Sequence, residues 1–181
     1  TGTCFFSSVF QNKLVLFVTR VAHIYYEMYW IGKLRCFGRN KRGQPLVSIG
    51  PNWPIAAFVV CFVVILAGVF QAFTSGVLSY IGIGVFGFLE LSFLMASLKD
   101  CGVVVGLNCS EEEGQFCELC GAVKQFGTVH CRDCDVCVKK FDHHCVVTGK
   151  CIGAGNIKWF HAFLSSIMCG FLYLIIAIVL S

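Results

Sequence analysis

The residues best suited to chemistry concentrate in one short segment of the chain. Seven of the 13 cysteines and three of the five histidines lie between Cys117 and Cys151. Three cysteine pairs in this segment have the C-x-x-C spacing that lets two thiolates reach one zinc ion from a turn: Cys117/Cys120, Cys131/Cys134 and Cys134/Cys137. In a reducing compartment, such pairs indicate metal sites rather than disulfides.

The number of candidate ligands indicates how many zinc sites the segment can form and how many side chains remain free. The segment offers ten cysteine and histidine side chains, whereas two closed tetrahedral zinc sites need eight. Two side chains are left over, and a free cysteine and a free histidine are what a nucleophile and its base require. The count does not say which two are free. An acid, a base and a thiol do lie within four residues, at Asp142, His143 and Cys145.

The complete spacing of the segment is highly specific. The string Asp142-His143-His144-Cys145 lies within the pattern C-x2-C-x9-H-C-x2-C-x2-C-x4-D-H-H-C-x5-C-I-G-x2-N. Over residues 117–160 this pattern resembles the cysteine-rich domain of the DHHC family of protein S-acyltransferases. The resemblance implies that one structural zinc is held by Cys117, Cys120, His130 and Cys137. It implies that a second is held by Cys131, Cys134, His144 and Cys151, which leaves His143 and Cys145 free.

The resemblance also implies an enzyme, a protein S-palmitoyltransferase that uses a long-chain acyl-CoA as donor. Cys145 would attack the thioester, His143 would accept its proton, and Asp142 would orient the imidazole. The acyl group would then pass to a cysteine of a membrane-associated substrate protein. Four lysines are candidates for binding the CoA phosphates, although solvated charges are the simpler interpretation of each: Lys139, Lys140, Lys150 and Lys158.

The chain departs from the family at several positions, among them Cys101 in an Asp-Pro-Gly element and residues 124–127 where Lys-Pro-x-Arg is common. Val146 and Val147 follow the tetrad where the family usually has Pro-Trp. A second hypothesis is therefore a catalytically impaired, zinc-stabilised membrane adaptor. The retention of all three candidate catalytic residues argues against it.

We expect no nucleic-acid partner, because the chain carries no basic stripe on a soluble domain. The substrate proteins and any accessory subunit are not predicted.

Composition places the candidate site in a membrane protein. Of the 181 residues 57% are hydrophobic and 13% are charged, and the mean hydropathy is +0.77. A span needs about 20 apolar residues, and residues 54–98 contain a single charge, Glu90. We predict spans over residues 55–73 and about 78–98, joined by a turn at residues 74–76, and a third span over residues 159–181. The fold class is thus a polytopic α-helical membrane protein with a loop-rich two-zinc domain between the second and third spans.

The distribution of lysine and arginine predicts the orientation. Basic residues precede the first span and lie between the second and third, whereas the turn between the first two has none. By the positive-inside rule, residues 1–53 and the zinc domain at 99–158 face the cytoplasm, with the hairpin at 54–98 and the third span at 159–181 in the membrane. We expect the endomembrane system, with Golgi or ER first, or the plasma membrane. We also expect the chain to stop before a fourth helix.

Other features have plainer interpretations. Apolar residues between Leu14 and Met28 recur at helical spacing, which fits an interfacial helix or a segment packed on its neighbours. Gly82, Gly84 and Gly87 match a nucleotide-binding spacing, but within a span they indicate close helix packing. Glu90, an acid inside a span, is a functional candidate, although reaching the interface or pairing with a neighbouring helix is the simpler interpretation.

Overall fold

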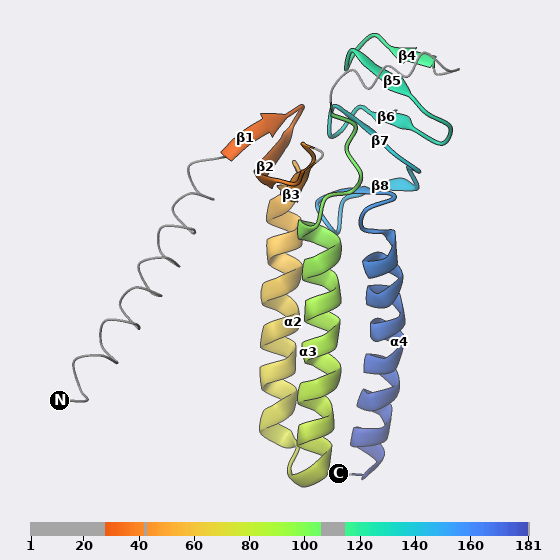
Figure 1. The fold of residues 1–181 in the computed structure, drawn as a ribbon. Helices are drawn as coiled ribbons and strands as arrows, with labels where there is room; N and C mark the ends of the chain where they lie inside the picture. Colours follow the sequence, from red (N-terminus) through yellow and green to blue (C-terminus); the bar gives the residue numbers. More distant parts are fainter. Residues whose placement is uncertain (1–27, 42, 106–114, 181) are drawn as a thin grey trace, which may run out of the picture.

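Three long helices stand side by side beneath a layer of short strands in the computed structural model, which describes residues 28–41, 43–105 and 115–180 (Figure 1). The helices are α2 (Trp53–Phe73), α3 (Gly76–Leu98) and α4 (Ile157–Leu180). Each is long and apolar enough to cross a membrane, as the sequence predicts. Each begins two residues before its predicted start, because a proline, a glycine or a lysine in the first helical turn interrupts the apolar run.

Helix α3 lies between the other two and packs closely on α4. A side chain at Gly82 would overlap the ring of Tyr173 on α4, so the absence of a side chain allows the close approach. The hydroxyl of Tyr173 donates to the carbonyl oxygen of Leu78 at 3.0 Å. The prediction of close packing is therefore confirmed at Gly82. At Gly84 and Gly87 an added methyl group would meet no other described atom within 4 Å, so these two positions do not show it.

The carboxylate of Glu90 on α3 does not form the expected pair with a neighbouring helix among the described residues. Both of its carboxylate oxygens are buried, and among the described residues neither has a hydrogen-bond partner. The side chain lines a cavity of about 300 Å³ between α2 and α3 together with Gln71. The predicted pairing with a neighbouring helix is thus not seen within the described part of the chain.

Ahead of the helices lies a three-stranded antiparallel sheet that the sequence did not predict. Its strands are β1 (Met28–Ile31), β2 (Leu34–Arg39) and β3 (Pro45–Ile49), in the order β1-β2-β3. Met28, expected at the end of a helical pattern, is the first residue of β1. The rest of that pattern lies outside the described residues.

This sheet shares one core with the cysteine-rich region. In β2 the side chains alternate, so that Leu34 and Cys36 are buried and join Cys134 and Val138 in that core. At the β1–β2 turn the backbone N–H of Lys33 donates to the carbonyl oxygen of Cys134 at 2.8 Å. The N-terminal sheet is therefore one wall of the cysteine-rich region.

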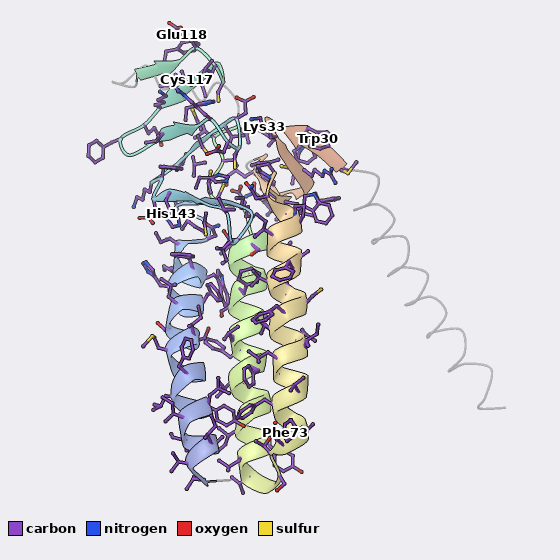
Figure 2. The ribbon with its side chains drawn as sticks, turned by 180° about the vertical axis from the view of Figure 1, so that it is seen from behind. Trp30, Lys33, Phe73, Cys117, Glu118 and His143 are labelled. Atoms are coloured by element: carbon purple, nitrogen blue, oxygen red, sulfur yellow. The ribbon has the colours of Figure 1, made fainter. Side chains whose placement is uncertain are left out.

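The cysteine-rich region itself is built from three short antiparallel hairpins. Each pairs two strands of three residues: β4 (Gln115–Cys117) with β5 (Ala122–Lys124), β6 (Val129–Cys131) with β7 (Val136–Val138), and β8 (His143–Cys145) with β9 (Lys150–Ile152). Hairpins of this size have little stability of their own. Figure 2 shows Cys117 near the tip farthest from the helices and His143 at the base, next to α4.

Asn156 joins the last hairpin to the helices. Its side chain is completely buried. The amide nitrogen donates to the carbonyl oxygens of Ala96 at 2.9 Å and Cys151 at 3.1 Å, and the amide oxygen accepts the N–H of Gly153 at 2.9 Å. One side chain thus ties α3, β9 and the start of α4 together.

Replacing Asn156 with alanine is expected to destabilise the protein by about 3 kcal/mol, because it leaves three buried backbone groups unpaired. The thermal midpoint of the detergent-solubilised protein should fall clearly. The exposed neighbouring position provides the control, since Ala154→Ser should leave the midpoint unchanged. An unchanged midpoint for Asn156→Ala would contradict the role of this junction.

Candidate active site and metal centres

One group of potential metal ligands lies at the base of the cysteine-rich region. Its four members, whose ligand atoms all lie within 4.8 Å of one another, are Cys131, Cys134, His144 and Cys151. The three sulfur atoms lie 3.6, 3.4 and 3.7 Å from Nδ1 of His144. Sulfur and nitrogen ligands on one tetrahedral zinc are roughly 3.6 Å apart, given Zn–S and Zn–N bonds of about 2.3 and 2.0–2.1 Å. The donor set and its spacing therefore suit zinc.

The ring of His144 is also held from outside this group. Its Nε2 donates to Oδ1 of Asn52, the residue that precedes α2, at 3.0 Å. A partner on the second ring nitrogen fixes the orientation of a metal-binding histidine and its tautomer. This metal group at the base of the cysteine-rich region, the base group, is thereby connected to α2, the first membrane-length helix.

A second group lies farther from the helices and has the same composition. Its members, also within 4.8 Å of one another, are Cys117, Cys120, His130 and Cys137. Nδ1 of His130 lies 3.1 Å from the sulfur of Cys120 and 4.0 Å from that of Cys137. On the other side of the ring, Nε2 pairs with a carboxylate oxygen of Asp135 at 3.5 Å. The eight candidate ligands fall into the two groups that the sequence resemblance implies.

Strand alternation separates the metal ligands from the candidate catalytic residues. Successive side chains of a strand point to opposite faces, and His144 of β8 lies opposite Cys151 of β9 in the metal group. His143 and Cys145 flank it in β8 and so share the other face. The ring of His143 packs on Phe160 of α4, with centroids 5.1 Å apart.

On this other face the acid, base and thiol are in contact. Nδ1 of His143 donates to a carboxylate oxygen of Asp142 at 2.7 Å. Burial alone would lower the pKa of His143, but hydrogen bonds with Asp142 and Cys145 raise it overall. Burial alone would raise the pKa of Cys145, but hydrogen bonds with Thr148 and His143 lower it overall. Both shifts favour a thiolate beside an imidazolium, the reactive form of such a pair.

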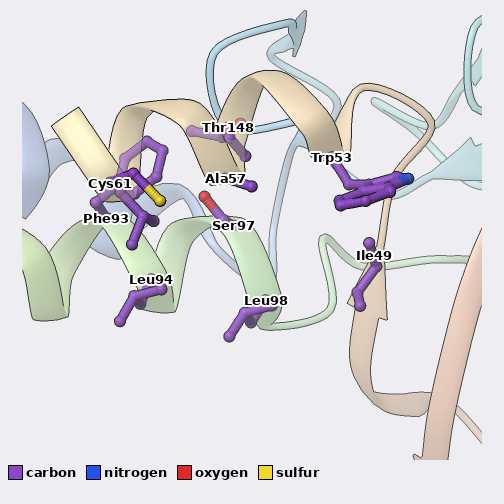
Figure 3. Close-up of a pocket in the computed structure, with 12 residues that line it drawn as sticks. Ile49, Trp53, Ala57, Cys61, Phe93, Leu94, Ser97, Leu98 and Thr148 are labelled. Atoms are coloured by element: carbon purple, nitrogen blue, oxygen red, sulfur yellow. The ribbon is translucent and has the colours of Figure 1, made fainter.

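An apolar cavity of about 300 Å³ opens between α2 and α3, and Thr148 of the β8–β9 turn is among the residues that line it (Figure 3). Ser97 also lines it, and Figure 3 shows Trp53 and Ile49 near the strand end of the helices. Thr148 also donates to the carbonyl oxygen of Cys145 at 3.3 Å, which connects the cavity to the nucleophile. The volume is at the lower end of ordinary ligand pockets.

The lysines expected to bind CoA differ in their surroundings. Lys140 and Lys158 are exposed and Lys139 is half-buried, so all three stay candidates. Lys150 is 0% exposed, and its ammonium donates to oxygens of Ser48 and Lys99 at 2.6–2.9 Å. Its assignment to CoA is wrong, because a phosphate could not reach a buried group that is already hydrogen-bonded.

Comparison with known proteins identifies the segment that carries this site. Residues 110–181 match the family model described as DHHC palmitoyltransferase. This match covers less than half of the chain. It is 41% identical over 54 residues to Palmitoyltransferase ZDHHC17 of Danio rerio, covering 30% of this chain and 9% of the relative. It is 42% identical over 53 residues to Palmitoyltransferase ZDHHC18 of Homo sapiens, and 44% identical over 48 residues to Palmitoyltransferase swf1 of Schizosaccharomyces pombe.

These relatives are much longer than the matched segment. The ZDHHC18 match covers 29% of this chain and 14% of the relative, and the swf1 match covers 26% and 14%. The similarity therefore covers only a short part of each relative, and the activity of the whole protein is a matter for proposal.

Sequence reasoning missed three residues that position the candidate site: Asn52, Thr148 and Lys150. Asn52 and Thr148 are ordinary turn residues by type, and neither has a signal in the sequence that points to a site. Lys150 carries a charge between apolar neighbours, which in most proteins means solvent exposure. The contacts of each residue become evident only in the three-dimensional structure, where the strands are paired.

Metal analysis should find two zinc ions per chain in the cysteine-rich region. Cys134→Ser should lose one of them, because three ligands of the base group would remain. Cys169→Ser is the matched control, since this exposed cysteine of α4 belongs to neither group, and it should retain both ions. Full zinc content in Cys134→Ser would contradict the assignment of the base group.

Proposed function

We propose that this protein transfers a long-chain acyl group from acyl-CoA to cysteine thiols of substrate proteins, through a thioester on Cys145. The observation that carries the proposal is the contact of His143 with both Asp142 and Cys145. His143 and Cys145 lie on the face of β8 opposite the metal group, and Thr148 connects Cys145 to the apolar cavity. The family match and the names of the relatives support the same chemistry.

In the first step His143 takes the proton of Cys145, and the resulting thiolate attacks the carbonyl carbon of the acyl-CoA thioester. A new carbon–sulfur bond forms on Cys145, and the carbon–sulfur bond to CoA breaks. The CoA thiolate leaves and can take the proton from His143. Asp142 stabilises the imidazolium while it exists, through the 2.7 Å hydrogen bond to Nδ1.

In the second step a cysteine thiol of the substrate protein gives its proton to His143 and attacks the thioester on Cys145. The acyl group moves to the substrate, and Cys145 leaves as a thiolate that the imidazolium stabilises or protonates. The two steps exchange one thioester for another, so neither an oxidant nor a further reactant is needed. Zinc held by the two groups would supply structure by fixing β8 and its neighbours.

The apolar cavity is the proposed location of the acyl chain. Its walls come from α2 and α3, and Thr148 connects it to Cys145. Each buried CH2 of the chain contributes about 0.8 kcal/mol, so a longer chain binds more tightly while the cavity can hold it. Lys139 and Lys140 precede β8 in the chain, and we propose them as contacts for the CoA phosphates.

We further propose that α2, α3 and α4 span a membrane with the cysteine-rich region on the cytoplasmic side. The basic residues near the strand end of the helices support this orientation by the positive-inside rule. The proposed substrates are membrane-associated proteins with accessible cysteines. The endomembrane system, with Golgi or ER first, or the plasma membrane is the proposed location.

Incubation with labelled palmitoyl-CoA tests the proposal. The wild-type protein should acquire a label that hydroxylamine removes, because hydroxylamine cleaves thioesters. Cys145→Ser should acquire none while keeping two zinc ions, and Cys169→Ser should label as the wild type does. His143→Ala should label about 10²- to 10⁴-fold more slowly, the usual effect of losing a general base, whereas His161→Ala should not.

Two results would contradict the proposal. A hydroxylamine-sensitive label of equal rate in Cys145→Ser would place the acyl group on another residue. No label on zinc-loaded wild-type protein would instead support the catalytically impaired adaptor, the alternative suggested by Val146 and Val147 after the tetrad.

A further inference from the structure

Lys150 is the cross-strand partner of Cys145 in the β8–β9 hairpin. We propose that Lys150 is a positioning residue that fixes this hairpin against the walls of the apolar cavity. It would thereby set where Cys145 stands relative to a bound acyl chain. This inference rests on the proposed function, since it takes the cavity as the acyl site.

The surroundings of the ammonium are those of a complete hydrogen-bonding site. Lys150 is 0% exposed. Its Nζ donates to the backbone oxygen of Ser48 at 2.8 Å, to the hydroxyl oxygen of Ser48 at 2.9 Å and to the backbone oxygen of Lys99 at 2.6 Å. An ammonium has three N–H donors, so each can have its own acceptor. Burying a charged group is costly unless it is hydrogen-bonded in this way.

The acceptors lie beside the cavity but on different elements. Ser48 belongs to β3 and precedes Ile49, which lines the cavity. Lys99 directly follows α3 and the cavity-lining Leu98. One side chain from β9 therefore holds two walls of the cavity, and the strand pairing carries this constraint to Cys145.

Other contacts bring the hairpin close to α2. The backbone N–H of Asn52 donates to the carbonyl oxygen of Gly149 at 3.2 Å. A side chain at Gly50 would overlap Gly149 and Lys150, so the β3–α2 connection passes directly against the hairpin. Lys150 extends this attachment to the end of α3, which the Asn52 contact does not reach.

Acyl-enzyme formation from two donors of different chain length tests the role. Butyryl-CoA needs the nucleophile but little of the cavity, whereas palmitoyl-CoA needs both in register. In Lys150→Met the rate with palmitoyl-CoA should fall about tenfold or more, since small misplacements of reacting groups have effects of this size. The rate with butyryl-CoA should change less than about twofold, and two zinc ions should remain.

The matched control is Lys99→Met, which removes an exposed lysine side chain at the same junction and keeps its carbonyl oxygen. It should leave the ratio of the two rates unchanged. Ser48→Ala removes one acceptor and keeps the other two, so it should lower the palmitoyl-to-butyryl ratio in the same direction by a smaller factor. If Lys150→Met does not fold, the rate ratio of Ser48→Ala tests the positioning role in its place.

Three outcomes separate the possibilities. Wild-type protein that labels with neither donor would contradict the proposed function itself. Labelling of wild type with an unchanged rate ratio in Lys150→Met, or in Ser48→Ala if the first does not fold, would overturn the positioning role. An increase in KM for both donors at unchanged kcat would also overturn it, because that pattern belongs to a CoA contact.

Discussion

The two faces of strand β8 impose the constraint on which the rest of the site depends. A strand sends successive side chains to opposite sides, so a residue held in the metal group orients both of its neighbours away from it. His144 is that residue, and its ring is fixed by three sulfur neighbours and by Asn52. His143 and Cys145 must then lie together on the opposite face. There His143 packs against Phe160 of α4, and Thr148 connects Cys145 to the cavity. A shift of β8 by one residue would exchange the two roles.

This arrangement explains why a region made of three-residue strands can hold a reactive group in place. Such hairpins bury too little apolar surface to be stable alone, and two metal groups are an alternative to a larger core. The base group also contributes Cys131, Cys134 and Cys151 to the core shared with the N-terminal sheet. Contacts of Asn52 and Asn156 then connect the region to the ends of the helices. Cys145, the proposed nucleophile, is thus held relative to the helices through the base group.

Part of this architecture was predictable because its signals are local. Apolar runs predicted the three helices to within two residues at their starts, and ligand spacing predicted the two groups that the structure brings together. The sheet β1–β3 was missed because its short strands mix basic, apolar and aromatic residues. Lys150 was misinterpreted because its acceptors are 51 and 102 residues away in the sequence. Contacts between residues so far apart in the sequence shape the cavity and join the cysteine-rich region to the helices. Local sequence patterns do not predict such contacts.

In the proposed enzyme, metal-held β8 presents Cys145 for acylation while the neighbouring cysteines stay bound to metal. Peptide mass spectrometry after brief reaction of the zinc-loaded protein with palmitoyl-CoA tests this claim most directly. We predict one thioester-linked palmitoyl group per chain, on Cys145, with Cys134 and Cys151 unmodified. A palmitoyl group on either of these two cysteines, with Cys145 free, would contradict it.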